Sequence, residues 1–327
     1  MNGTAGNATT GLDQETITSL VLGYTVSTLV IILNGLEIYI IRKRRKKITD
    51  FELILFNLAT ADCLTGIANL ISTGFETHWY LSDKSLLEEI YAGSYILIFI
   101  AVIMSVNFVI LIGIERLFAV RLPLQHRMFH MKRRKVYGGI AIIWLLTIVI
   151  CILAVVLDHV INNGILTEYG SKYLGIAYGS FLSLQSLIII VIYSSLAFYV
   201  AKRQSRLKKF NRATFQASRK SLEISWKRER ATLIVCFLVV ASFIICTTPF
   251  SVKLYKYETE DNESILLLSN SAINPLIYFF KGFVEKYHRR RKSVEDAFKV
   301  NKEMGRTKRM HVAEAANNPA FVEKEDA

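Results

Sequence analysis

The chain has 327 residues, 52% of them hydrophobic, and a formal net charge of +13. Several long runs almost free of charged residues exclude a water-soluble globular protein, which rarely leaves so much continuous apolar chain uncovered. The basic residues flank these runs instead of forming one patch, which argues against nucleic acid as a partner.

Seven apolar segments are candidates for membrane spans, each of which needs roughly 20 residues. They lie at about 18–41, 53–75, 91–114, 136–157, 173–201, 231–255 and 264–280. We therefore expect an all-α fold, a seven-transmembrane helix bundle over residues 18–280. Residues 202–230 are expected to continue the fifth and sixth helices beyond the membrane.

The connections between the segments alternate in charge. Four basic clusters follow the first, third, fifth and seventh segments: Arg42–Lys47, His126–Lys135, Lys202–Arg230 and His288–Lys292. Cytoplasmic loops carry the excess of Lys and Arg, so the N-terminus, residues 1–17, is predicted outside and the C-terminus in the cytoplasm. These N-terminal residues lack a basic n-region, so the first span is expected to be an uncleaved anchor.

Glycosylation sequons and cysteines are consistent with this topology. The sequons begin at Asn2, Asn7 and Asn262, all on the predicted outer side. The four cysteines, Cys63, Cys151, Cys236 and Cys246, all lie within predicted spans. We therefore expect no extracellular disulfide and interpret the cysteines as small buried apolar residues.

The chain beyond the last span divides into two parts. Residues 281–300 continue a pattern, begun at Phe279, of aromatic residues at helical spacing with charges between them. This pattern predicts a short amphipathic eighth helix on the cytoplasmic face, in contact with membrane lipids. Residues 301–327 are polar and alanine-rich, and are predicted to be a disordered cytoplasmic tail.

Polar residues inside the predicted spans are costly in lipid and are candidates for function. The set comprises Asn34, Asp62, Ser105, Asn107, Asn270, Ser271 and Asn274. One interpretation is a hydrogen-bonded network that locks helices together, and the other is a sodium or proton site that biases conformation. The two are compatible. One carboxylate among neutral oxygen groups suits a hard monovalent cation rather than zinc.

Two further motifs contain charges or prolines. Glu115-Arg116-Leu117 ends the third segment and is followed by Pro123-Leu124, while Glu229 precedes the sixth. The seventh segment contains Asn274-Pro275. A proline frees a backbone carbonyl one turn back, and in lipid that carbonyl needs an internal partner. We therefore expect this helix to be polar and easily bent at Asn274-Pro275.

In their order along the chain, these motifs resemble those of the rhodopsin-like G-protein-coupled receptors. The matching residues are Asn34, Leu58-Ala59-Thr60-Ala61-Asp62, Glu115-Arg116-Leu117, Pro123-Leu124, Trp144, Tyr193, Phe243, Cys246-Thr247-Thr248-Pro249 and Asn270–Tyr278. The resemblance covers nearly the whole chain.

This resemblance implies a receptor, not an enzyme, which senses an extracellular ligand and activates heterotrimeric G proteins by outward movement of helix six. Arrestin is a further implied partner. The implied switch is Arg116, held at rest by Glu115 and Glu229, with Tyr193 and Tyr278 swinging inward on activation. The implied sodium pocket is Asp62, Ser105, Asn270, Ser271 and Asn274, and no other cofactor is expected. The implied helix-six hinge is Phe243, Cys246, Thr247 and Pro249.

Four positions depart from the family pattern. Leu117 replaces a tyrosine, Thr247 a tryptophan, Gln185 a proline and Tyr91 a cysteine. The change at Tyr91 is shared with the branch that holds melanocortin, cannabinoid, lysophospholipid and adenosine receptors. The change at Thr247 removes the usual trigger, which leaves high basal activity and an atypical ligand as alternatives.

The ligand class is constrained by two positions. Ile98 stands where amine receptors carry aspartate, so a biogenic amine is not the expected ligand. Leu268 stands where opsins carry the retinal lysine, so light sensing is not expected either. The predicted outer cavity is lined by Ile98, Phe99, Val102, Tyr178, Phe181, Phe250 and Leu254. Helix packing accounts for most of these residues, and as a binding site they favour an apolar, lipid-like ligand. The acidic outer loops leave a basic peptide as an alternative.

Two other classes of membrane protein are alternatives to a receptor. A transporter or channel would use Asp62 as an ion site, but no inverted repeat is evident. An integral-membrane metalloenzyme is suggested by the spacing of His126 and His130, but further histidine clusters are missing.

Overall fold

The computed structural model describes residues 14–43, 48–81, 88–122, 133–161, 172–211, 237–252 and 265–279, together with residues 234 and 304. Within these ranges the chain is helical except at residues 48, 49 and 122, and it forms no strand. The predicted all-α fold is confirmed for this part of the chain.

Five of the helices are long and apolar enough to cross a membrane. They are α1 (Gln14–Lys43), α2 (Asp50–Leu81), α3 (Glu88–Arg121), α5 (Arg133–Ile161) and α6 (Lys172–Asn211). Two shorter apolar helices, Phe237–Val252 and Ile265–Phe279, follow. These seven helices coincide with the seven predicted segments, so the chain is a multi-pass membrane protein. As predicted, α6 continues well past residue 201.

The start of α2 is fixed by a capping box, in which the first residues of a helix satisfy their free backbone donors reciprocally. The Thr49 backbone N–H donates to Glu52 Oε2 at 3.0 Å, and the Glu52 backbone N–H donates to Thr49 Oγ1 at 3.2 Å. These bonds define where the first turn of α2 begins, and Phe51 is part of that turn.

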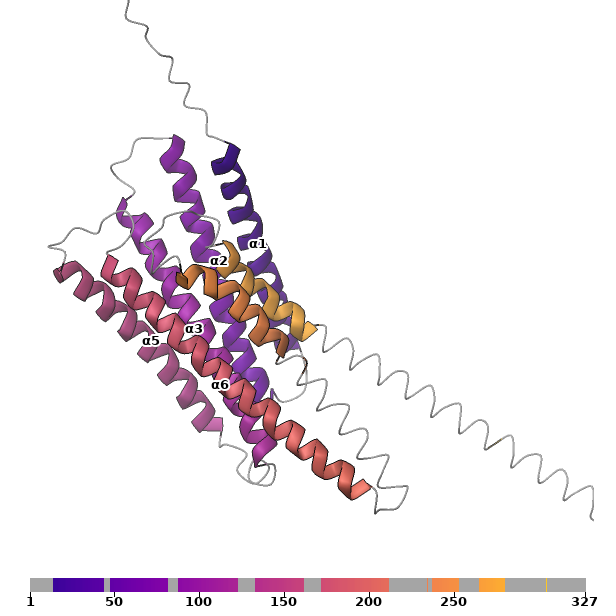
Figure 1. Ribbon diagram of the computed structural model, residues 1–327. Coiled ribbons are helices and arrows are strands. Elements are labelled where there is room, and N and C mark those ends of the chain that lie inside the picture. Colours follow the sequence, from indigo (N-terminus) through magenta and orange to yellow (C-terminus); the bar gives the residue numbers. More distant parts are fainter. Residues whose placement is uncertain are drawn as a thin grey trace, which may run out of the picture. The chain divides into compact units, whose positions relative to one another are not determined.

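Helix α3 contacts α2, α5 and α6, while α1 packs on α2 (Figure 1). Over their apolar spans α2 and α3 are 50% and 56% buried, whereas α1, α5 and α6 are 28% buried or less. The interior of the bundle is therefore built on α2 and α3, and the other three helices present exposed apolar faces, as lipid-facing helices do. The side chain of Trp144 ties α5 to α2 by donating to Asn57 Oδ1 at 3.2 Å.

The chain divides into two units, residues 1–277 and 278–327. The helices from α1 to Ile277 belong to the first. Several predictions lie outside the described residues: the sequons, Cys236, the histidine pair, the eighth helix and tail apart from residue 304, and the site residues Pro123, Leu124, Glu229 and Leu254.

Candidate functional site

A buried polar cluster surrounds Asp62 of α2, a residue with no exposed surface. Ser271 Oγ donates to Asp62 Oδ1 at 2.8 Å, and Asn274 Nδ2 donates to Asp62 Oδ2 at 3.2 Å. Both partners come from the helix Ile265–Phe279, more than 200 residues along the chain. The juxtaposition of these three residues, predicted from the motifs, is therefore present.

Two other predicted members of the cluster, Ser105 and Asn270, are buried but lack full hydrogen bonds. The Ser105 hydroxyl of α3 interacts with the Asp62 carboxylate, but its geometry leaves Oγ without a hydrogen-bond partner among the described residues. Asn270 is buried in the same helix as Ser271, and its Oδ1 also has no described partner. Asn270 makes no hydrogen bond to Asp62 within this part of the chain.

Asn34 of α1 compensates for Pro275. A proline at 275 has no backbone N–H to offer the carbonyl of Ser271, one turn earlier. Asn34 Nδ2 donates to that carbonyl at 2.9 Å, and also to the carbonyl of Val30 in α1 at 2.9 Å. The carbonyl freed by the proline thus has an internal partner, as the absence of water in the membrane interior requires. This bond also fixes α1 to the proline-containing helix.

The side chains of the predicted sodium site offer oxygen atoms, and the site itself stays a prediction. Besides the Asp62 carboxylate, three buried side-chain oxygens lack described donors: Ser105 Oγ, which interacts with Asp62, and Asn34 Oδ1 and Asn270 Oδ1, which make no hydrogen bond to Asp62 within the described residues. Oxygen ligands of this kind suit sodium, whereas zinc prefers nitrogen and sulfur. Among the described residues there is no group of three or more His, Cys, Asp or Glu side chains that could hold a transition metal.

Arg116, near the end of α3, is held by two side chains. Its Nε lies 3.2 Å from Glu115 Oε2, the ion pair that the motif predicted. Its guanidinium carbon lies 3.8 Å from the centroid of the Phe51 ring, in the first turn of α2. The Arg116 side chain is 24% exposed, so both contacts are partly shielded from water.

The Phe51 contact was missed by the sequence analysis. Its signal was available: an aromatic residue at the predicted cytoplasmic start of the second span, at the same membrane depth as Arg116 in the third. Sequence alone could not show which way the ring points, because that depends on how α2 is rotated against α3.

Tyr193 of α6 anchors that helix to α3. Its hydroxyl donates to the backbone carbonyl of Val109 at 3.2 Å. The close approach needs a glycine at 113, one turn later in α3, since a Cβ there would lie 2.8 Å from the Tyr193 ring. Tyr193 is thus held against α3, and its inward swing on activation stays a prediction. Tyr278 begins the second unit, and its role stays a prediction.

The predicted helix-six hinge lies in the helix Phe237–Val252. Phe243, Cys246 and Thr247 are all buried. Thr247, which stands in place of the family's tryptophan, donates its hydroxyl to the Phe243 carbonyl at 2.8 Å. The Thr247 hydroxyl is therefore hydrogen-bonded within its own helix. At this position there is no large aromatic ring to transmit a ligand contact.

The predicted outer pocket is divided between two places. Phe99, Tyr178 and Phe250 form an aromatic cluster that joins α3, α6 and the helix Phe237–Val252, with ring centroids 4.2 Å apart for Phe99–Tyr178 and 6.4 Å for Tyr178–Phe250. The Tyr178 hydroxyl is buried without a described partner. Val102 is buried and Ile98 half-buried in α3. Phe181 instead lines a separate cavity between α3 and α5.

Comparison with known proteins settles the family. The family model described as "7 transmembrane receptor (rhodopsin family)" matches residues 33–278, well over half of the chain. The chain belongs to the rhodopsin family of seven-transmembrane receptors. It is also similar to a protein from Danio rerio described as G-protein coupled receptor 183-A, at 23% identity over 291 residues, covering 77% of this chain and 73% of that protein.

Membership of this family supports a G-protein-coupled receptor and favours neither the transporter nor the metalloenzyme. It does not distinguish the melanocortin, cannabinoid, lysophospholipid and adenosine branch, which stays a prediction from Tyr91. The roles of the individual residues are likewise predictions, to which the geometry above adds contacts and distances.

Proposed function

We propose that this chain is a plasma-membrane receptor, with its N-terminus outside, which binds an extracellular ligand and activates heterotrimeric G proteins by outward movement of the helix Phe237–Val252. The observation that supports this most strongly is the environment of Arg116. In a chain of the rhodopsin family, this arginine is held against the bundle by Glu115 and Phe51, in an orientation that a binding partner has to release.

The two contacts contribute only part of the switching energy. A partly exposed ion pair is worth about 0–1 kcal/mol, and a cation–π contact about 0.5–2 kcal/mol. Moving an equilibrium from almost fully inactive to almost fully active takes about 5.5 kcal/mol of differential binding. Ligand binding and G-protein binding therefore have to supply most of the difference.

Sodium bound at Asp62 would also favour the inactive state of the receptor. The cation would be held by Asp62, Ser105 and the neighbouring amide oxygens, which belong to α1, α2, α3 and the helix Ile265–Phe279. Binding there stabilises the arrangement in which these four helices are close together. It thus opposes any movement that separates them, and we assign sodium the role of a negative modulator of agonist binding.

The ligand that the aromatic cluster fits best is uncharged and mostly apolar. Phe99, Tyr178 and Phe250 offer ring surface, and the buried Tyr178 hydroxyl is a single polar group that a ligand can bond. A buried hydroxyl without a partner is costly, so a ligand that bonds it recovers that cost on binding.

Nucleotide exchange on purified heterotrimeric G protein tests this proposal, with the chain reconstituted in lipid nanodiscs. Arg116→Ala is expected to abolish the exchange that the wild-type chain catalyses, while Arg121→Ala retains it. Arg121 is a matched control, since it lies on the same helix and stacks on a ring, that of Tyr199, at 5.3 Å. Equal and measurable exchange by wild type and Arg116→Ala would refute the assigned role. Exchange by neither wild type nor Arg121→Ala, across the G-protein classes and with a broad panel of apolar and peptide ligands, would refute the function.

A further inference from the structure

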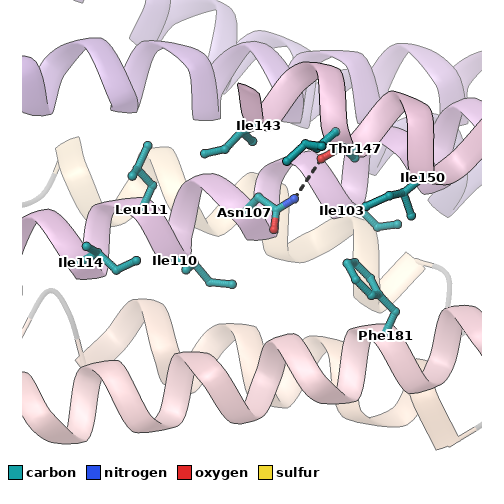
Figure 2. A pocket seen from close by; sticks show the side chains of 10 residues that line it. Ile103, Asn107, Ile110, Leu111, Ile114, Ile143, Thr147, Ile150 and Phe181 are labelled. Carbon is teal, nitrogen blue, oxygen red and sulfur yellow. Dashed lines mark hydrogen bonds between the residues drawn. The ribbon is translucent and has the colours of Figure 1, made fainter. Parts of the chain in front are cut away.

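A cavity of about 310 Å³ lies between α3 and α5, with Phe181 of α6 closing one side (Figure 2). Eight of its ten lining residues are apolar, and none is charged. The volume is at the small end of the range for ligand pockets, roughly 300–1,000 Å³. The cavity is separate from the Asp62 cluster and from the aromatic cluster around Tyr178.

The two polar residues of the lining, Asn107 and Thr147, have unused donors. Asn107 Nδ2 donates one hydrogen to Thr147 Oγ1 at 3.0 Å, and Asn107 Oδ1 accepts from Gln185 Nε2 at 2.9 Å. The second amide hydrogen of Asn107 and the hydroxyl hydrogen of Thr147 meet no acceptor among the residues that the structure describes. Thr147 is only 3% exposed, so bulk water does not satisfy its hydroxyl. The wall therefore offers two hydrogen-bond donors in apolar surroundings.

Access to the cavity is from the side of the bundle. The lining residues Leu146 and Ile150 of α5 are 52% and 47% exposed, on a helix whose apolar span is only 17% buried. In a membrane-spanning chain such a surface faces lipid. A charged molecule would lose its hydration on entering without meeting a counter-charge, whereas an uncharged lipid would not.

We propose that this cavity binds an uncharged glyceride whose ester carbonyl accepts hydrogen bonds from Thr147 and Asn107. A carbonyl oxygen fits because both unused groups are donors and a carbonyl has two lone pairs. The remainder of the molecule is hydrocarbon and packs against the isoleucines of α3 and α5. The site is independent of the proposed receptor activity, and its test uses no signalling readout.

Photolabelling with benzophenone tests the site, because this probe is an apolar ketone with one carbonyl oxygen. The full chain is reconstituted in nanodiscs of ether-linked phosphatidylcholine, which has no ester carbonyl to compete. Mass spectrometry is expected to place the label on peptides of α3 and α5 that line the cavity, and added monoolein should suppress it. Hexadecane, which has no oxygen, should suppress it much less.

Two matched pairs of variants locate the binding. Ile150→Trp fills the cavity and should abolish labelling, whereas Ile152→Trp, at an exposed α5 position outside the lining, should leave it unchanged. Thr147→Val should lower labelling about two- to tenfold, the loss expected for one hydrogen bond, and Thr147→Ser should restore it. Equal labelling in both tryptophan variants, or in Thr147→Val and Thr147→Ser, would overturn the proposal, as would label that monoolein does not displace.

Discussion

Replacing Phe51 by leucine should raise the ligand-free activity of the receptor. The ring of Phe51 lies 3.8 Å from the Arg116 guanidinium carbon, and the arginine is 24% exposed. A contact of this kind contributes about 0.5–2 kcal/mol. A loss of about 1 kcal/mol from the inactive state alone changes the ratio of active to inactive receptor about fivefold. Basal exchange should therefore rise by up to about fivefold.

The assay is nucleotide exchange without ligand, at equal amounts of folded receptor in nanodiscs. Phe56→Leu is the matched control, because Phe56 lies on the same helix, is also half-buried and stacks under Arg42 at 5.1 Å. It should cost similar packing without touching Arg116, and so should leave basal exchange at the wild-type level. Phe51→Trp keeps an aromatic face and should also keep basal exchange low.

The reasoning would be refuted if Phe51→Leu matched both wild type and Phe56→Leu in basal exchange while its thermal unfolding was unchanged. It would be refuted equally if Phe51→Trp raised exchange as much as Phe51→Leu. In either case the stacked ring would not be what restrains Arg116.

Three further predictions concern the buried polar residues and the cysteines. Asp62→Asn should remove the sodium dependence of agonist affinity, and the account fails here if wild type binds agonist equally in sodium and in a bulky organic cation. Asn34→Leu should lower the free energy of unfolding by about 1–3 kcal/mol, because it leaves the Ser271 carbonyl without a donor. The loss should shrink when Pro275→Ala restores the backbone N–H, and equal losses in both backgrounds, measured by thermal denaturation, would contradict the pairing. Reducing agent should leave ligand binding and thermal stability unchanged, and detection of a disulfide-linked peptide by mass spectrometry would overturn that expectation.

The existence of the helices and the grouping of Asp62, Ser271 and Asn274 could be predicted from the sequence. Long apolar runs have few alternatives in a membrane, and a buried carboxylate needs partners, which were few and were recognisable by motif. Glu115 and Arg116 are consecutive in the chain, so their ion pair could be predicted without knowing how the helices pack.

The contacts that were missed all depend on how one helix is rotated or shifted against another. Phe51 could be assigned to the start of a helix, but not to a position over Arg116. Gln185 was recognised only as a replacement for proline, and its bond to Asn107 depends on the depth of α6 relative to α3. Asn34 was assigned to the polar set, yet its role in bonding the carbonyl freed by Pro275 required the register of α1 against the seventh helix. The rotation, depth and register of one helix against another are set by packing, and the pattern of a single sequence does not contain them.

In the proposed mechanism, G-protein binding frees Arg116 while the helix Phe237–Val252 moves outward from α3. Spin labels at Phe118 and Phe237, both exposed side chains, report this movement by pulsed electron resonance in a background without native cysteines. We expect a longer distance between the labels when nucleotide-free G protein is bound. In Phe51→Leu, we expect a larger fraction of the longer distance even without G protein. An unchanged distance distribution in a preparation that still catalyses nucleotide exchange would contradict it.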